Sequence, residues 1–211
     1  MDGVLVDSEG IFRDASMDVS TARGLDLPLA VYLRMVGAPR EQNRQVILEH
    51  FGAEFGFDDW IEAVSVEASA RMAAGAILKP GARELLDDLK AAQVPCAVAT
   101  SSGHAGVERH LGSAGLLGYF QVIVARGDYP RGKPYPDPFL LAADRLRVAP
   151  AACLALEDSH NGVRAASAAG MMTIMVPDLL APTEEMRGLC VAVVTGLDEV
   201  RRILERGGTF G

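Results

Sequence analysis

Acidic, hydroxyl and basic side chains gather in four short segments, each at or just beyond the end of a short apolar run. The segments are MDGVLVDSEG (1–10), AVATSSG (97–103), RGKPYPDPF (131–139) and LALEDSHNG (154–162). Glu157 and Asp158 directly follow an apolar run, and adjacent carboxylates repel each other unless a cation is present. Oxygen-only ligands of this kind suit Mg²⁺. The sequence therefore predicts a site that combines carboxylates, hydroxyls and one lysine.

The hydroxyl groups of Thr100, Ser101 and Ser102 stand between a predicted strand and a predicted helix. A hydroxyl in this position can donate a hydrogen bond to a phosphate oxygen, and the free N–H groups at the start of a helix favour an anion. The alternative is that one of these side chains only caps the helix. In the same way, Asp158, Ser159 or Asn161 could serve only as the cap of the helix that follows the acidic pair.

Lys133 lies between Gly132 and Pro134, in a stretch that cannot be regular helix or strand. A fixed loop can direct the ammonium group of this lysine into a site. The alternative is a solvated lysine in an ordinary turn. The PDP sequence that follows (136–138) predicts the start of a helix.

Five short apolar runs predict the strands that position these segments. They are VPCAVA (94–99), QVIVA (121–125), CLALE (153–157), MTIMV (172–176) and CVAVV (190–194). The runs are continuous rather than alternating, which indicates strands covered on both faces. Helical patterns lie between them, so we expect an α/β fold with a doubly wound parallel sheet. In such sheets ligands bind at the carboxyl ends of the strands.

The first third of the chain has a different pattern. Residues 10–75 contain helical patterns and no convincing strand. We expect an all-helical domain there, inserted into a core made of residues 1–9 and 76–211. The stretch AGAILKPGA (74–82) has the glycines and proline of a return hinge, and Trp60 is expected to pack in the core of the insertion.

Composition excludes several classes of protein. The chain has 211 residues, of which 49% are hydrophobic, and a net charge of −8, so it is globular and has no basic stripe for nucleic acid. No apolar run is long enough to cross a bilayer, and the start lacks the basic residues of a signal peptide. We therefore expect a cytoplasmic protein with no membrane partner, and a monomer by default. Cys96, Cys153 and Cys190 are expected to be buried, reduced thiols.

In this order, the four segments resemble the motifs of the haloacid dehalogenase superfamily. The resemblance is closest to the branch with a helical cap after the first motif, which includes β-phosphoglucomutase and many sugar-phosphate phosphatases. It covers nearly the whole chain. It implies a Rossmann-like core with an inserted helical cap, and Mg²⁺-dependent hydrolysis of a small phosphorylated metabolite, with a sugar phosphate as the favoured substrate.

The first motif of that family is Asp-x-Asp-Gly, and Asp2 matches its second aspartate. In the family, the first aspartate is the nucleophile and the second is the general acid and base. The resemblance places the nucleophile on the residue immediately before Met1, which this sequence does not contain. We expect the natural protein to begin further upstream. The alternative is a non-catalytic protein that binds phosphorylated metabolites.

The resemblance also assigns the phosphate contacts. Thr100 would hold a phosphoryl oxygen, Ser101 and Ser102 would lie beside the substrate, and Lys133 would neutralise the nucleophile and the transferred group. Mutase members carry a lysine two or three residues after the hydroxyl, where this chain has Ser102 and Gly103. A phosphatase is therefore favoured over a phosphohexomutase.

The remaining assignments concern the metal and the cap. The resemblance implies that Mg²⁺ binds Glu157, Asp158 and the backbone carbonyl of Asp2. Arg40, in the cap segment GAPRE (37–41), and His104 would contact the substrate; the alternative for both is an ordinary surface or capping role. The presence of Asp2 argues against dehalogenation, because dehalogenase members lack the second aspartate of the first motif.

Overall fold

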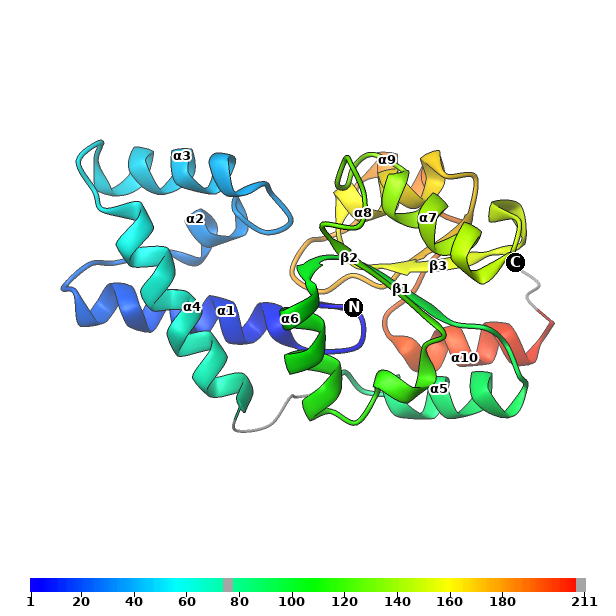
Figure 1. Cartoon of the computed structure of the whole chain (residues 1–211). Coiled ribbons are helices and arrows are strands. Elements are labelled where there is room, and N and C mark those ends of the chain that lie inside the picture. The colour runs from blue at the N-terminus through cyan, green and yellow to red at the C-terminus, as the bar shows by residue number, and fades with distance from the viewer. Residues whose placement is uncertain (74–77, 208–211) are drawn as a thin grey trace.

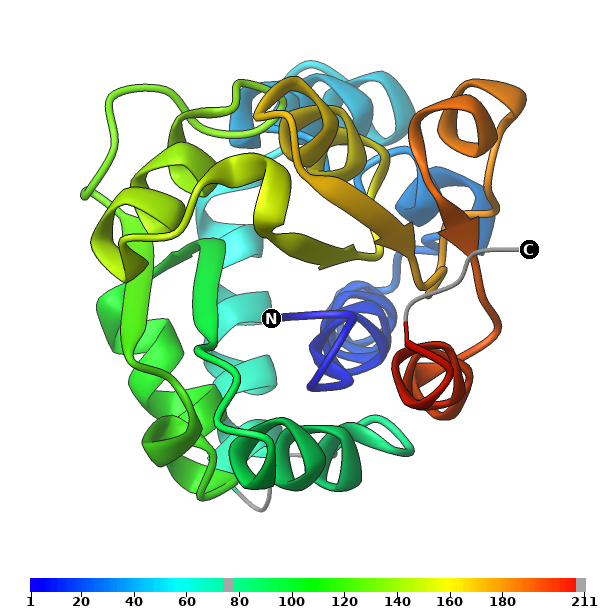
Figure 2. The ribbon, with the colours of Figure 1, turned by 90° about the vertical axis from the view of Figure 1, so that its right-hand side faces the viewer.

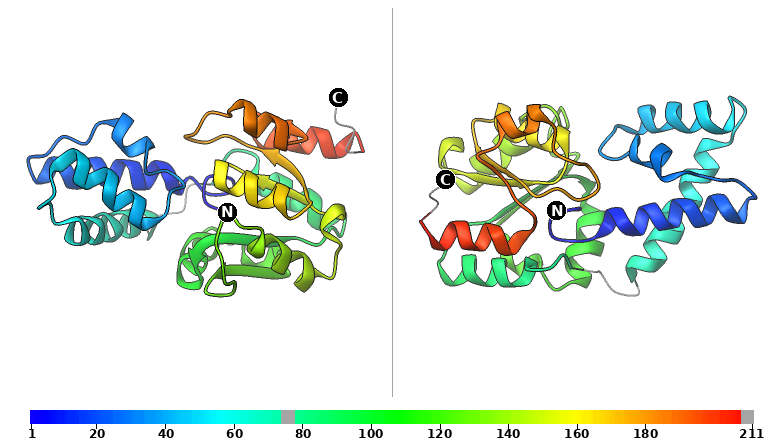
Figure 3. Two further views of the ribbon diagram at one scale, coloured as in Figure 1. Left: turned by 90° about the horizontal axis from the view of Figure 1, so that it is seen from above. Right: turned by 180° about the vertical axis from the view of Figure 1, so that it is seen from behind.

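The computed structural model describes residues 1–73 and 78–207, whose elements form two groups (Figure 1). The first group consists of α1 (Ser8–Ala22), α2 (Leu29–Leu33), α3 (Arg40–Phe51) and α4 (Phe57–Ala73). Views from above and from behind show the two groups as separate lobes (Figure 3). The predicted boundary at 75/76, with the hinge residue Gly75, lies outside the described residues, so the domain limits stay a prediction.

The second group is an α/β core. Its strands are β1 (Ala97–Gly103), β2 (Val122–Arg126), β3 (Leu154–Glu157), β4 (Met172–Met175) and β5 (Ala192–Val193). Its helices are α5 (Ala82–Ala91), α6 (His104–Val107), α7 (Asp137–Leu146), α8 (His160–Ala168), α9 (Glu184–Leu189) and α10 (Leu197–Glu205), with shorter turns η1 (Glu108–Gly112), η2 (Leu117–Tyr119) and η3 (Pro150–Ala152). Each of the five predicted apolar runs forms a strand, and the PDP sequence begins a helix.

All five strands pair in parallel, but they form two separate sheets. β1 pairs with β2, and β4 lies between β3 and β5. The N-terminal segment lies between the two sheets (Figure 2). Its Val6 shares one core cluster with Val98 of β1 and Ile174 of β4. The predicted parallel sheet is thus confirmed in strand direction, but within the described residues no ladder joins β1 to β3, because the segment between them makes only isolated bridges at Val6.

Helices cover both faces of the strands, as a doubly wound fold requires. Leu85 of α5 and Leu197 of α10 belong to the same cluster as Val98. On the other face, Phe139 of α7 and Ala165 of α8 form a second cluster around β3. Figure 1 shows α5 and α10 on one side of the strands, with α7 and α8 on the other.

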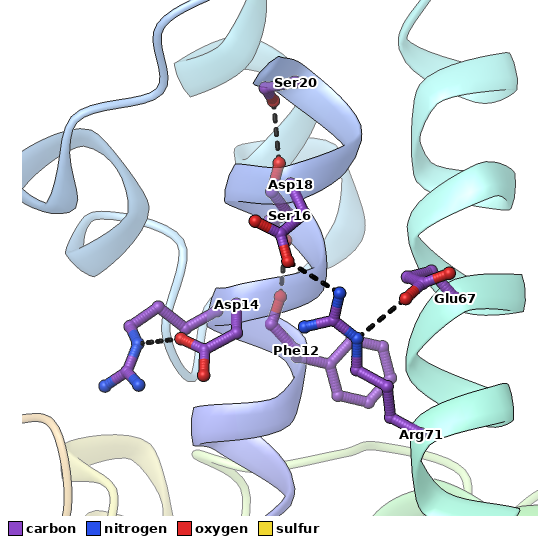
Figure 4. Close-up of polar contacts among 8 residues, drawn as sticks. Phe12, Asp14, Ser16, Asp18, Ser20, Glu67 and Arg71 are labelled. Atoms are coloured by element: carbon purple, nitrogen blue, oxygen red, sulfur yellow. Dashed lines mark hydrogen bonds and ion pairs between the residues drawn. The ribbon is translucent and has the colours of Figure 1, made fainter. Parts of the chain in front are cut away.

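The cap has a hydrophobic core of its own, and α1 and α4 lie side by side within it. Trp60 is fully buried in this core, as predicted, and its indole N–H donates to Ser20 Oγ at 3.1 Å. Arg71 of α4 pairs with Asp18 of α1 at 2.6 Å (Figure 4). Described residues 10–73 contain no strand, in agreement with the predicted helical insertion.

Two predictions from composition can be compared with the structure. The cysteines are free, but they are half-buried rather than buried, so that part of the prediction is wrong. Cys96, Cys153 and Cys190 come just before β1, β3 and β5, where the chain enters the sheet from the surface and packing covers a side chain only in part. No helix among the described residues has both the length and the apolar composition to cross a membrane.

Two valines on α4 allow a matched test of the cap core. Val64 is fully buried, whereas Val66 is 66% exposed. We expect Val64→Ala to lower the free energy of unfolding by about 2 kcal/mol, because two buried methyl groups are lost and a small cavity remains. Val66→Ala should change it by less than about 0.5 kcal/mol. Urea unfolding followed by the fluorescence of the single tryptophan measures both; equal effects would contradict this account of the cap.

Candidate active site

A cavity of about 660 Å³ is lined jointly by the carboxyl ends of the core strands and by the cap helices. Eight of the nine predicted site residues line it: Asp2, Arg40, Thr100, Ser101, Ser102, Lys133, Glu157 and Asp158. His104 does not line it; its side chain is 60% exposed and its ring lies 2.9 Å from Asp128. Segments that are far apart in the sequence are therefore brought together as expected, apart from His104, whose substrate contact stays a prediction.

Lys133 and Glu157 form a buried ion pair at the floor of the cavity. Their side chains are only 11% and 5% exposed, and the ammonium group also donates to the Ala99 carbonyl at 3.1 Å. A lysine held in this way is not a solvated turn residue. Because a charge buried without its partner is strongly unfavourable, this pair holds the loop after β2 against the end of β3.

Two glycines allow the acidic pair to sit where it does. A Cβ atom on Gly162 would overlap the Glu157 carboxylate, and one on Gly3 would overlap the Asp158 carboxylate. Gly3 also has a positive φ of +72°, which residues with side chains rarely adopt. Space therefore requires glycine at both positions, and the backbone conformation also favours it at Gly3.

The cavity concentrates negative charge. Burial raises the pKa of the Asp158 carboxyl, and the adjacent charge of Glu157 raises it further. Glu9, in the first turn of α1, also lines the cavity. Burial, followed by the charges of Asp158 and Asp2, raises the pKa of Glu9 to about 7. A cation in this space would relieve the cost of holding these carboxylates ionised.

The carboxylate oxygens of Glu157 and Asp158 are ligands that suit a hard divalent cation, although two side chains alone do not complete its coordination. Among residues 1–73 and 78–207, no three His, Cys, Asp or Glu side chains converge as metal ligands. Glu157 is engaged by Lys133 and by Ser159 Oγ at 3.3 Å, whereas no hydrogen bond from another described residue reaches the Asp158 carboxylate, which lies against Gly3. An Mg²⁺ ion here would take carboxylate oxygens and complete its coordination with backbone, water or substrate oxygens.

The Asp2 carboxylate is held by three side chains. Ser8 Oγ and His110 Nδ1 lie 3.0 Å and 2.6 Å from its Oδ1, and Ser102 Oγ donates to its Oδ2 at 2.9 Å. Burial alone would raise the pKa of Asp2, but the hydrogen bond from His110, then the positive charge of the amino group of Met1, and then the charge of His110 and the hydrogen bond from Ser102 lower it to about 2. The carboxylate is therefore ionised and fixed in orientation.

The hydroxyl segment does not serve as a helix cap. Thr100 is buried, and its Oγ1 accepts a hydrogen bond from the Ser102 backbone N–H at 3.1 Å. Helix α6 begins after Gly103 without any side-chain cap. After the acidic pair, Ser159 caps α8, since its Oγ accepts a backbone hydrogen bond at 3.1 Å. The capping alternative thus applies to Ser159 and leaves Asp158 free for another role.

The cap contributes the opposite wall. Arg40 is 63% exposed and pairs with Asp58 at 2.9 Å while lying over the Phe57 ring. Contact with a substrate would have to compete with this ion pair, so the proposed role of Arg40 stays a prediction. Asn161 of α8 donates to the Gly37 carbonyl at 2.9 Å and so links the core to the cap loop.

His110 was not among the site residues predicted from the sequence. Its side chain is 7% exposed and it reaches Asp2 from η1, well beyond the hydroxyl motif. The available signal was its spacing: Val107, His110 and Leu111 follow the i, i+3, i+4 pattern of a buried helix face, and all three are buried. A histidine on such a face points toward the core, but only the fold shows that its partner is Asp2.

Comparison with known proteins agrees with this geometry. The haloacid dehalogenase-like hydrolase family matches residues 1–170. A probable pseudouridine-5'-phosphatase of Drosophila melanogaster is 34% identical over 184 residues, which cover 84% of this chain and 79% of that protein. The fructose-1-phosphate phosphatase YqaB of Escherichia coli is 32% identical over 178 residues, which cover 83% of this chain and 93% of that protein.

A solved structure is similar over almost the full length. The HAD family hydrolase from Deinococcus radiodurans R1, determined with bound phosphate and sodium, has a TM-score of 0.82 and 30% identity, and the match covers 99% of this chain and 93% of that one. The resemblance inferred from the four motifs is thereby confirmed. This chain belongs to the haloacid dehalogenase-like hydrolases, with the α/β core and cap of that family.

Proposed function

We propose that this protein is an Mg²⁺-dependent phosphatase that hydrolyses a small phosphorylated metabolite, with sugar phosphates as the favoured class. The observation that carries the proposal is the meeting of Asp2, Thr100, Lys133 and the acidic pair Glu157–Asp158 in one cavity. The names of the Drosophila and Escherichia coli relatives, a nucleotide phosphatase and a sugar-phosphate phosphatase, support the same reaction.

In this proposal the phosphoryl group lies between Thr100 and Lys133. The Thr100 hydroxyl donates to a phosphoryl oxygen, and the Lys133 ammonium offsets part of the dianion's charge. Asp158, Glu157 and the backbone carbonyl of Asp2 would hold Mg²⁺. The metal, when bound, supplies the positive charge that lets a phosphate dianion approach three carboxylates.

Asp2 would move the proton. The proposed nucleophile is an aspartate immediately before Met1, which forms a P–O bond as the ester P–O bond breaks, while Asp2 protonates the departing oxygen. Asp2 then takes a proton from the water that releases inorganic phosphate and restores the carboxylate. A dianion beside Asp2 would raise its pKa by like-charge repulsion, in the direction that a general acid needs.

A matched pair of aspartate variants tests the role of Asp2. In protein expressed with the codons upstream of Met1 included, we expect Asp2→Asn to lower kcat by roughly 10²–10⁴-fold, the usual contribution of a general acid–base. Asp14→Asn, at a side chain on α1 that is 51% exposed, should have no effect. Release of phosphate from fructose 1-phosphate measures both.

The same assay can reject the proposal. No Mg²⁺-dependent release from any ester of a broad panel, in a folded sample, would contradict it. An in-frame stop codon directly before Met1 would favour the non-catalytic binder. Formation of an isomerised product instead of free phosphate would indicate a phosphomutase.

The carboxylates of the cavity predict a pH dependence of stability that Mg²⁺ should suppress. Because folding raises the pKa of Glu9 from 4.5 to about 7 and raises that of Asp158, the folded state binds these protons at higher pH than the unfolded chain. The stabilisation is therefore absent well above pH 7, grows as the pH falls through 7, and is complete below about 4.5. Metal-free protein should gain on the order of 2 kcal/mol between pH 8 and pH 6.

Thermal denaturation in a chelating buffer measures this effect, with a Tm that we expect to rise by roughly 4–8 °C from pH 8 to pH 6. Saturating Mg²⁺ should raise Tm mainly at pH 8, because the metal competes with the protons. Glu9→Gln should stabilise the metal-free protein at pH 8 and flatten the slope. A Tm that is flat or that rises with pH in metal-free protein would show that the carboxylates are not held as described.

A further inference from the structure

Arg126 lines the same cavity and has no assigned role. It is the last residue of β2, lies opposite Gly103 in the β1·β2 register, and is exposed. Its Nη2 atom is 3.9 Å from the position that a Cβ on Gly103 would occupy. The guanidinium group therefore lies beside the hydroxyl segment, in the wall of the cavity.

Arg126 differs from the other long cations of the cavity. Lys133 is paired with Glu157, and Arg40 is paired with Asp58. Within residues 1–73 and 78–207, Arg126 forms no ion pair and no hydrogen bond through its side chain. It is thus the cavity cation whose charge no carboxylate of the described chain neutralises.

The acid nearest to Arg126 in the sequence is already engaged. Asp128 Oδ1 lies 2.9 Å from His104 Nε2, and its Oδ2 accepts from Arg145 at 3.1 Å. The chain carries 28 acidic and 20 basic residues, so carboxylates are abundant. A guanidinium left unpaired in a cavity of such a protein is available to an anion from outside, and its planar fork suits a carboxylate or a phosphate.

Tyr129 relates Arg126 to the phosphoryl position. Its hydroxyl donates to the Thr100 carbonyl at 2.9 Å. Tyr129, Lys133 and Arg126 all line the same cavity. A phosphoryl group at Lys133 and a second anionic group at Arg126 can therefore belong to one small molecule.

Resting on the proposed function, we infer that Arg126 binds a second anionic group of the substrate, a carboxylate or a second phosphate. The site would then favour phosphate esters that carry a second anionic group over esters with a neutral leaving group. Arg126 is a specificity residue in this scheme, because it contacts the part of the substrate that does not react.

Two matched substrate pairs test the inference and distinguish the two anions. Fructose 1,6-bisphosphate is compared with fructose 1-phosphate, and 3-phosphoglycerate with glycerol 3-phosphate, in protein expressed with the codons upstream of Met1. We expect Arg126→Gln to lower kcat/KM by about tenfold for at least one ester with a second anionic group, equivalent to about 1.4 kcal/mol. For the matched ester without that group, kcat/KM should fall by less than about twofold. Arg126→Lys should retain part of the preference. Arg109→Gln, at an exposed arginine outside the cavity, should change neither.

The outcomes separate the two proposals. Hydrolysis with an equal effect of Arg126→Gln on both members of each pair, or with no effect on either, would overturn the inference and leave the phosphatase intact. If no ester is hydrolysed, the proposed function fails. Calorimetric titration of the same four compounds then still tests Arg126, because the wild type should bind the member of a pair that carries the second anionic group about tenfold more tightly and Arg126→Gln should not.

Discussion

The buried ion pair between Lys133 and Glu157 is the interaction on which the rest of the site depends. Glu157 ends a strand inside the protein, where an unpaired carboxylate would be strongly unfavourable. The pair fixes the loop after β2 to the end of β3, and Gly162 leaves the space that the carboxylate needs. Among the residues that the structure describes, Asp158 forms no ion pair, and its pKa is raised by burial and by Glu157. The site is thus built to receive positive charge.

The division into core and cap follows from separate hydrophobic cores. The residues that bury Trp60 form a cluster distinct from the one around Val98 and Ile174. The two lobes meet over the cavity, where Asn161 contacts the Gly37 carbonyl. Polar groups placed between two independent cores can be exposed or enclosed without disrupting either one, which suits a site that must admit a charged small molecule.

Much of the fold was predictable because the signals are local. Continuous apolar runs such as CLALE and MTIMV mark strands covered on both faces, and each forms one. The candidate site was also largely predictable, because the carboxyl ends of parallel strands share one edge, so Thr100, Lys133 and Asp158 had to lie near each other. The half-buried cysteines were not predictable from their apolar neighbours, because burial at the entry to a strand depends on what packs over it.

The sequence by itself determined the order of the chemical groups along the chain. It shows which residue types follow which apolar runs, and therefore which family the chain resembles. Tertiary structure alone decided the contacts between segments, such as His110 against Asp2, and the split of the sheet around the N-terminal segment. It also decided the placement of Arg126 in the cavity without a carboxylate partner from residues 1–73 or 78–207. The physical reason is the range of the interactions. Strand and helix signals arise from neighbours a few residues apart, whereas packing between distant segments chooses the partner of a buried charge, as for Asp2 and His110, which are 108 residues apart.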